Sequence, residues 1–234
     1  MVFNFNNVLV TGGSGFVGVP LIKKLIDNKK NVTSLDIKPN PDSNINFIQA
    51  DIRDAAAVKK AGKDVDIIFN LASVVPQSDV PASHYKDVIV GGMKNVLDAA
   101  IERGIKVVHI SSSGVYGADR EGIVKEDDQK KPIGPYGNAK LEAELVCQDY
   151  AKKGINVVIL RPMAIIGPGV YGVFKIFMKF VYKSYPLVLF GNGNNKIQLA
   201  SLSDTVEALL CAAKYENSGE AFNIGSDNIP TVRE

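Results

Sequence analysis

The sequence NVLVTGGSGFVG at residues 7–18 decides the fold. Its opening residues, 7–11, form a short run that is typical of a buried strand. Gly12, Gly15 and Gly18 then follow in the G-x-x-G-x-x-G form of a dinucleotide-binding loop. In such a loop the first glycine permits a tight turn, the second lets backbone N–H groups approach a pyrophosphate, and the third lets the next helix pack on the strand. The stretch therefore predicts a strand, a phosphate loop and a helix, in that order.

Residues 17–28 are predicted to form that helix because their apolar side chains recur at helical spacing. Its N-terminus would present unpaired amides to a pyrophosphate, so Phe16 and Val17 become candidate cofactor contacts. Asp36 closes the next predicted strand, residues 31–37. A carboxylate at this place accepts hydrogen bonds from both hydroxyls of an adenosine ribose and repels a 2′-phosphate. We therefore predict NAD rather than NADP as the cofactor.

Apolar runs and helical segments continue to alternate as far as Arg161. Further strands are predicted at residues 45–50, 65–72, 106–112 and 155–161, and further helices at 54–62, 84–103 and 136–153. Strands that are apolar throughout and alternate with helices indicate a parallel sheet covered on both faces. The predicted fold class is therefore α/β, a doubly wound sheet of the Rossmann type.

After this alternation the chain becomes rich in glycine and aromatic residues. We assign residues 1–164 to an NAD-binding domain and residues 165–234 to a small, incomplete substrate-binding lobe. Within the second segment, a helix near 203–214 is expected to pack back on the first domain, and a short strand is expected at 221–224.

Composition narrows the classes of function. The chain has 234 residues, of which 46% are hydrophobic and 22% charged, and its net charge is +2. It is long enough to form a core, and the balanced charge favours neither nucleic acid nor a membrane surface as partner. No apolar run reaches the roughly 20 residues of a membrane span, and the N-terminus lacks a secretory pattern, so we predict a cytoplasmic protein. Cys147 and Cys211 lack metal-ligand spacing and are predicted to be buried thiols, and no metal site is predicted.

Tyr136 and Lys140 open the predicted helix 136–153 at the spacing Y-x-x-x-K. Side chains four residues apart share a helix face, so the phenol and the ammonium should point the same way. Lys140 is then expected to lower the pKa of Tyr136 and make it a usable base. Ser112 ends a strand at the carboxyl edge of the sheet, where ligands bind in open parallel sheets. The alternatives are a solvated surface pair and an ordinary turn at the strand end.

Several motifs together resemble the extended short-chain dehydrogenase/reductase family. Within it, the chain is most similar to the NAD-dependent epimerase/dehydratase group that acts on nucleotide sugars. The motifs stand in the order of that family along essentially the whole chain: TGGSGFVG at 11–18, SSSGVYG at 111–117, YGNAK at 136–140, LRPMAIIGPG at 160–169 and LSDTVEALLCAA at 202–213.

The resemblance assigns a cofactor site and a substrate site to positions of this chain. Asp51 and Ile52 would meet the adenine, and Pro162 would lie near the nicotinamide. With the residues above, the cofactor contacts become Gly12, Gly15, Phe16, Val17, Gly18, Asp36, Asp51, Ile52, Leu71, Ala72, Tyr136, Lys140 and Pro162. The substrate contacts become Ser112, Ser113 and Tyr136, and the catalytic set becomes Ser112, Tyr136 and Lys140.

The resemblance also implies a reaction. Tyr136, as phenolate, would take the proton of a sugar hydroxyl while the sugar carbon gives a hydride to NAD, and an epimerase returns the hydride to the other face. Family dehydratases have Asp-Glu after the catalytic serine, and the decarboxylases have a Glu in that segment. This chain has Ser113-Gly114 at these positions, a pattern that is similar to that of the 4-epimerases. We therefore expect an NAD-dependent epimerase of a nucleotide sugar, acting at C4.

Two other functions stay open. Ile89 and Ala164 occupy places where the family often has Asn, and LRPMAIIGPG is similar to hydroxysteroid-dehydrogenase-like members. One alternative is therefore an NAD(P)-dependent dehydrogenase or reductase of a non-sugar hydroxyl or ketone. The other is a non-catalytic dinucleotide-binding regulator, which the intact catalytic set argues against. The lysines expected to contact a diphosphate are Lys175, Lys179, Lys183 and Lys196. The resemblance further implies a homodimer formed through helices 84–103 and 136–153.

Overall fold

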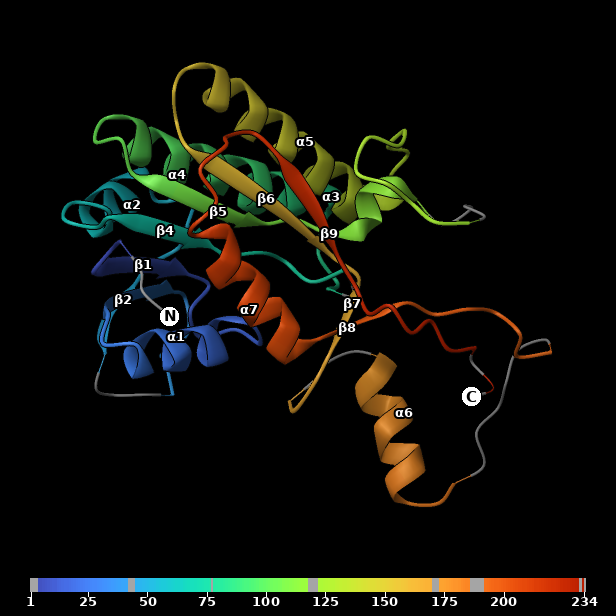
Figure 1. Ribbon diagram of the computed structural model, residues 1–234. Helices are drawn as coiled ribbons and strands as arrows, with labels where there is room; N and C mark the ends of the chain where they lie inside the picture. Colours follow the sequence, from blue (N-terminus) through green and yellow to red (C-terminus); the bar gives the residue numbers. More distant parts are fainter. Residues whose placement is uncertain are drawn as a thin grey trace.

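A parallel sheet of seven strands forms the centre of the molecule (Figure 1). The computed structural model describes residues 4–41, 45–76, 78–117, 122–169, 173–185, 192–231 and 233. The strand order is β3-β2-β1-β4-β5-β6-β9, and every neighbouring pair is parallel. The strands are β1 (Asn7–Thr11), β2 (Asn31–Asp36), β3 (Asn46–Gln49), β4 (Ile67–Asn70), β5 (Lys106–Ile110), β6 (Val157–Pro162) and β9 (Ala221–Ile224).

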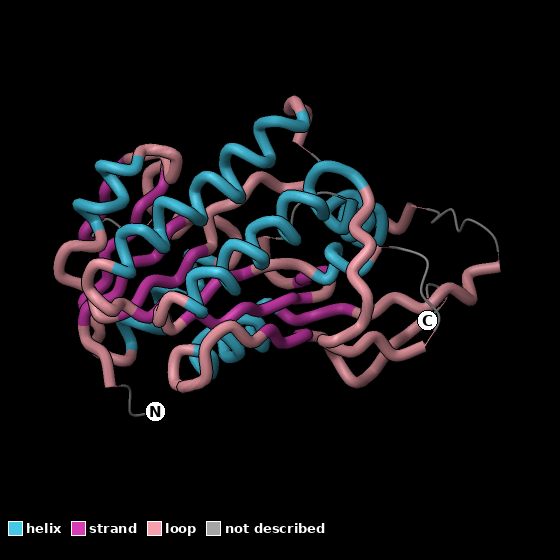
Figure 2. Tube along the Cα trace, turned by 90° about the horizontal axis from the view of Figure 1, so that it is seen from above, coloured by secondary structure: helices cyan, strands magenta, loops and turns pink. Residues whose placement is uncertain are grey.

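Helices cover both faces of this sheet, which confirms the predicted α/β, doubly wound fold. One face is covered by α1 (Gly18–Asp27) and α7 (Leu202–Ala212). The other face is covered by α2 (Ala55–Ala61), α4 (Gly92–Ile101) and α5 (Gly134–Lys152). Figure 2 shows, from above, how the long helices lie over the strands.

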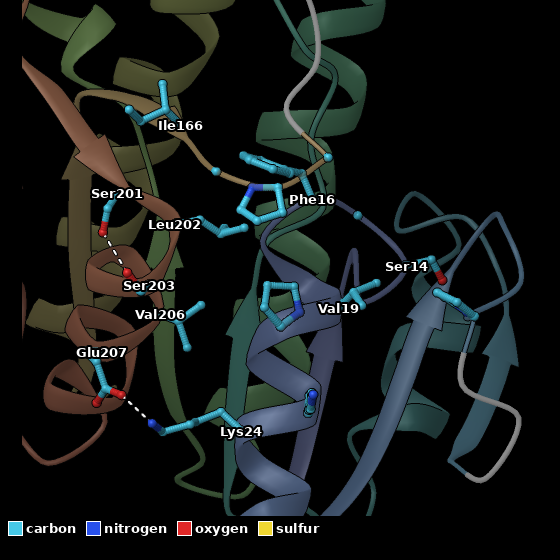
Figure 3. Close-up of a pocket in the computed structure, with 17 residues that line it drawn as sticks. Ser14, Phe16, Val19, Lys24, Ile166, Ser201, Leu202, Ser203, Val206 and Glu207 are labelled. Carbon is cyan, nitrogen blue, oxygen red and sulfur yellow. Dashed lines mark hydrogen bonds and ion pairs between the residues drawn. The ribbon is translucent and has the colours of Figure 1, made fainter. Parts of the chain in front are cut away.

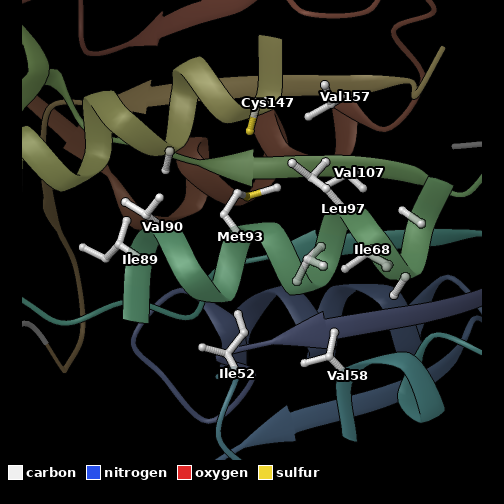
Figure 4. Packing of buried hydrophobic residues seen from close by; sticks show 14 of the residues in the cluster. Ile52, Val58, Ile68, Ile89, Val90, Met93, Leu97, Val107, Cys147 and Val157 are labelled. Carbon is white, nitrogen blue, oxygen red and sulfur yellow. The ribbon is translucent and has the colours of Figure 1, made fainter. Parts of the chain in front are cut away.

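Each central strand sends apolar side chains to both faces. In β1, Leu9 packs into the core under α2, α4 and α5, while Val8 and Val10 pack into the core under α1 and α7. Figure 4 shows the first of these cores, where Met93 of α4 and Cys147 of α5 lie among side chains from the strands. Because both faces are dry, the strands need apolar residues at every position rather than at alternate ones. This is the physical reason that the apolar runs in the sequence predicted the sheet.

The predicted helix 84–103 is continuous but not uniform. It consists of α3 (Ala82–Tyr85), a π-helical segment η1 (Lys86–Gly91) and then α4. A Cβ on Gly92 would lie 2.6 Å from the Cγ2 of Ile52, so a glycine is needed where this helix approaches the segment after β3. The approach buries Ile52, which is 4% exposed.

The segment after residue 164 contributes to the main sheet as well as to structures outside it. β7 (Ala164–Ile166) pairs with β8 (Leu199–Ser201) in a two-stranded parallel sheet, and α6 (Val173–Tyr182) extends away from the body (Figure 1). In contrast, α7 packs against β6 and α1, and β9 adds the seventh strand beside β6. The division of the chain at residue 164 stays a prediction.

Two further findings concern the expectations from composition. Cys147 is buried as predicted, but Cys211 is exposed, because it lies on the outer side of α7, whose apolar side faces the sheet. Among the described residues, no helix combines the length and the apolar character that a membrane crossing requires.

Candidate functional site

The strand order reverses between β1 and β4, and the glycine loop lies at this point. Gly12 has a left-handed backbone (φ +70°), and a Cβ there would lie 2.6 Å from the amide nitrogen of Ala72, just after β4. A Cβ on Gly18 would lie 2.3 Å from the carbonyl oxygen of Gly12. The fold therefore requires glycine at both positions, as the motif predicted.

Gly15 differs from the other two glycines. It is exposed, and a Cβ there would meet a single neighbour, the Gly12 carbonyl oxygen, at 3.1 Å. A side chain would therefore meet less steric resistance at this position than at Gly12 or Gly18. Its missing side chain leaves the backbone of the loop open at the sheet edge, as the approach of a pyrophosphate requires.

The start of α1 leaves room for an anion. Its N-cap, Val17, has no capping side chain, and its first turn holds no acidic residue, so the positive end of the helix dipole faces the loop. Asp36, at the end of β2, accepts hydrogen bonds from the backbone N–H groups of Ser14 (3.0 Å) and Lys38 (3.0 Å). The carboxylate proposed for the ribose is thus held against the loop proposed for the pyrophosphate.

The residues predicted around the adenine lie after β3. Asp51 pairs with Arg53 at 2.7 Å, and this hydrogen-bonded partner lowers the pKa of Asp51. Ile52 is buried next to it. Leu71 follows β4, where its N–H donates to the carbonyl of Thr11 at 3.0 Å and ties β4 to β1. These positions, with Ala72, line the same edge of the sheet as the glycine loop.

The three predicted catalytic residues come together at the carboxyl ends of β5 and its neighbours. Ser112 caps η2 (Ser113–Tyr116) by accepting a hydrogen bond from the N–H of Gly114 at 3.1 Å, and its hydroxyl acts on Tyr136 to lower the pKa of that phenol. Lys140 lies one turn along α5, with its Nζ 5.8 Å from the centroid of the Tyr136 ring. That Nζ donates to the carbonyl of Ile110 at 2.9 Å. The arrangement excludes the alternative of a solvated surface pair, because Lys140 is 1% exposed.

The pKa of Tyr136 differs from the expectation. Burial raises the pKa of Tyr136, and the hydrogen bond from Ser112 only partly opposes this effect. Burial also lowers the pKa of Lys140 to about 8, against the opposing charge of Glu144. The expected net lowering of the Tyr136 pKa is therefore not found, because burial outweighs the groups that favour phenolate. The spacing of the two residues determines that they share one face of the helix. It does not determine how deeply the two side chains are buried.

A buried ionic network lies beside this set and was not predicted from the sequence. Arg161 of β6 and Glu144 of α5 form an ion pair at 2.8 Å, and each side chain is 1% exposed. Ser111 donates to the same carboxylate at 2.5 Å, and Arg161 donates to the hydroxyl of Tyr116 at 2.5 Å. The available signal was the position of Glu144, four residues after Lys140.

The remaining predicted site residues are placed as follows. Pro162 ends β6 opposite Ile224, and Ser113 begins η2. Lys179, Lys183 and Lys196 are exposed. Lys175 falls among the α6 side chains that lie outside the described ones. No group of three His, Cys, Asp or Glu side chains within the described ranges could hold a metal ion.

A cavity of about 810 Å³ opens on the α1 side of the glycine loop (Figure 3). Ser14 and Phe16 line it from the loop, Ile166 from β7, and Leu202 and Val206 from α7. It reaches the segment proposed for the pyrophosphate, but Ser112, Tyr136 and Lys140 are not among its lining residues.

A parallel sheet with a glycine loop at its point of strand reversal defines a dinucleotide-binding protein of the Rossmann class. Comparison with known proteins gives the family. Residues 8–225 match the NAD dependent epimerase/dehydratase family, and the chain belongs to it. This match confirms the predicted resemblance to the extended short-chain dehydrogenase/reductase family.

The chain is similar to proteins of this family from several organisms. It is 33% identical to an uncharacterized Sinorhizobium fredii protein, over 97% of this chain but only 58% of the relative's length. It is also 33% identical to a putative UDP-glucose 4-epimerase of Methanocaldococcus jannaschii, covering 97% of this chain and 79% of that protein. The structure superposes on a UDP-glucuronic acid 4-epimerase from Bacillus cereus in complex with NAD, with a TM-score of 0.87, 27% identity, and 97% and 80% coverage. Other relatives are named as a dTDP-D-glucose 4,6-dehydratase and a UDP-N-acetyl-alpha-D-glucosaminuronate decarboxylase.

Proposed function

We propose that this chain is an NAD-dependent epimerase of a nucleotide sugar, acting at C4. The observation that carries the proposal is the cluster of Ser112, Tyr136 and Lys140 at the same carboxyl edge of the sheet as the glycine loop. The relatives named as 4-epimerases support the reaction class. Because other relatives are named as dehydratases and decarboxylases, the choice among these reactions depends on the residues after Ser112. These are Ser113 and Gly114, at the start of η2, and neither carries the carboxylate expected for elimination or decarboxylation.

The loop and its surroundings fit NAD. The open backbone at Gly15 and the uncapped start of α1 would hold the pyrophosphate, and Asp36 would hold the adenosine ribose. Lys140 and Pro162 would flank the nicotinamide end. When bound, NAD supplies the acceptor and donor of a hydride.

The chain's own residues handle the proton and the orientation of the substrate. As the phenolate, Tyr136 takes the proton from the sugar hydroxyl, and Ser112, whose hydroxyl lowers the pKa of Tyr136, holds the same oxygen in place. The charged Nζ of Lys140, 5.8 Å from the ring centroid, favours phenolate over phenol and so opposes the effect of burial. The same three residues stabilise the keto sugar until it turns over, and Tyr136 then returns the proton.

A specific observation favours a second candidate, a dehydrogenase or reductase of a non-sugar hydroxyl or ketone. Ile89 is 2% exposed and Ala164 lies in β7, and neither can make the polar contacts of the Asn that the family often has at these places. Both candidates use the same proton chemistry, so product analysis is needed to separate them.

The experiment incubates the protein and NAD with UDP-, GDP- and dTDP-sugars and follows epimerised product by NMR. Tyr136→Phe should lower turnover by at least about 10²-fold and leave NAD binding intact, because only the proton transfer is lost. Tyr150→Phe is the matched control, since this tyrosine lies on the same helix and bonds Asp98 near the surface. Retained turnover in Tyr136→Phe would remove Tyr136 as the base. NADH build-up without epimerised sugar would favour the second candidate.

A further inference from the structure

The face of α5 that carries Tyr136 and Lys140 carries a third polar residue, Glu144. The three are spaced four residues apart, so they follow one another along the same side of the helix. Lys140 and Glu144 are each 1% exposed. Along this face of the helix, a buried ammonium and then a buried carboxylate thus follow the proposed catalytic phenol.

Glu144 is held by groups from neighbouring strands. Arg161 donates from Nε to Oε1 at 2.9 Å and from Nη2 to Oε2 at 2.8 Å, and Ser111 donates to Oε1 at 2.5 Å. Arg161 is itself tied to the loop before α5, because it donates to the Tyr116 hydroxyl and to the Glu126 carbonyl at 3.0 Å. The carboxylate is therefore fixed in position.

Stability alone does not explain this ion pair. Replacing a buried ion pair by apolar residues of similar size is often neutral or stabilising, because desolvation of two charges cancels much of their attraction. A pair kept at this position therefore needs a further reason. Lys140 supplies such a reason. Its Nζ donates to the neutral carbonyl of Ile110. A buried lysine without a nearby anion tends to lose its proton.

Within the described part of the chain, the other groups that face Lys140 bring no negative charge at neutral pH. On α5, burial raises the pKa of Tyr136 and the pKa of the Cys147 thiol, so both are neutral. On β5, the pKa of His109 is lowered to about 3, so its ring is also neutral. Arg161, on β6, is positive and lies against Glu144. Glu144 is thus the carboxylate that acts on Lys140.

We infer that Glu144 is a positioning residue: clamped by Arg161 and Ser111, it keeps Lys140 charged behind Tyr136. The role of that charge in turnover rests on the proposed function. The charge itself does not, and it is measurable without NAD or substrate.

The experiment measures the pKa of Lys140 by NMR on lysine-labelled protein, with the Nζ signal assigned by its loss in Lys140→Met. The double variant Glu144→Gln/Arg161→Met removes both charges of the pair and so leaves no orphan charge in the core. Glu142→Gln is the matched control, because Glu142 is on the same helix but pairs with Lys86 at the surface. The pKa of Lys140 should lie above 7 in the wild type and the control, and fall by about one unit or more in the double variant.

Each outcome decides the inference. A folded double variant with the wild-type pKa of Lys140 would show that Glu144 has a structural role only. If thermal melting shows that the double variant does not fold, the wild-type protein decides: a Lys140 that is neutral at pH 7 overturns the inference, and a charged one supports it. Absence of epimerised sugar with a shifted pKa of Lys140 would overturn the proposed function and leave the inference standing.

Discussion

The backbone of Ala72 lies so close to Gly12 that a Cβ at residue 12 would come within 2.6 Å of the Ala72 amide nitrogen. Gly12 also has a left-handed backbone, which costs an L side chain additional free energy. We therefore expect Gly12→Ala to lower the free energy of unfolding by about 1–3 kcal/mol through overpacking. Urea unfolding followed by circular dichroism measures this change.

Gly15→Ala is the matched control for Gly12→Ala and carries a prediction of its own. Its Cβ would meet only the Gly12 carbonyl oxygen, at 3.1 Å, so stability should fall less. NAD affinity should fall about tenfold or more, because the methyl group occupies the space proposed for the pyrophosphate. Isothermal titration calorimetry measures the affinity. Equal NAD affinity in Gly15→Ala and wild type would contradict the placement of the pyrophosphate.

Asp36 sets the expected preference between NAD and NADP. Its carboxylate is held by the N–H groups of Ser14 and Lys38, so it stays in place whether or not a ribose is bound. Asp36→Asn keeps the shape and removes the charge that repels a 2′-phosphate, and the ratio of the two dissociation constants should shift toward NADP by about tenfold, or 1.4 kcal/mol. Titration of both dinucleotides tests this. A wild-type protein that already prefers NADP would show that the ribose assignment is wrong.

Local patterns were sufficient to predict the central sheet. The strands stand out in the sequence as continuous apolar runs between helical segments. This is because β1, β4, β5 and β6 are buried on both faces, and a strand of that kind is apolar at nearly every position. The glycine loop was predictable for a similar reason, because backbone contacts at Gly12 and Gly18 allow no side chain.

The rest depends on contacts between distant parts of the chain. The ion pair of Glu144 and Arg161 exists because α5 packs on β6, and no local pattern states this pairing. The pKa of Tyr136 follows from burial by several elements, whereas the spacing to Lys140 shows only a shared face. The π-helical segment at Lys86–Gly91 has no periodic signature that distinguishes it from the helix around it.

Association through α4 and α5 stays a prediction, and the structure suggests how to test it. The two helices contact each other, and Leu145 of α5 is 53% exposed. Light scattering should give a mass of twice 25.2 kDa for the wild type and a monomer for Leu145→Glu, because an interface would bury this side chain and then reject a charge. Ile123→Glu is the control, since Ile123 is 88% exposed and lies outside both helices. A monomeric wild type at micromolar concentration would overturn the prediction.

His109 gives the fold a dependence on pH that does not involve catalysis. The ring is 1% exposed, and Nδ1 lies 3.2 Å from the Nδ2 of Asn70, whose Oδ1 accepts a hydrogen bond from Thr11. An amide Nδ2 donates, so Nδ1 accepts and the ring is neutral. Burial, and then the charge of Lys140, lower the pKa of His109 from 6.5 to about 3 in the folded protein.

The sign of the effect follows from which state binds the proton first. As pH falls below about 6.5, the unfolded chain protonates His109 while the folded protein does not, so stability present above this pH is lost toward pH 3. The slope contributed by one proton is about 1.4 kcal/mol per pH unit. His109→Gln cannot take up this proton, so its free energy of unfolding should fall less steeply between pH 6.5 and about 4.5, while the two proteins run parallel above pH 7. Urea unfolding at a series of pH values measures both slopes, and equal slopes below pH 6.5 would mean that the ring is protonated inside the fold.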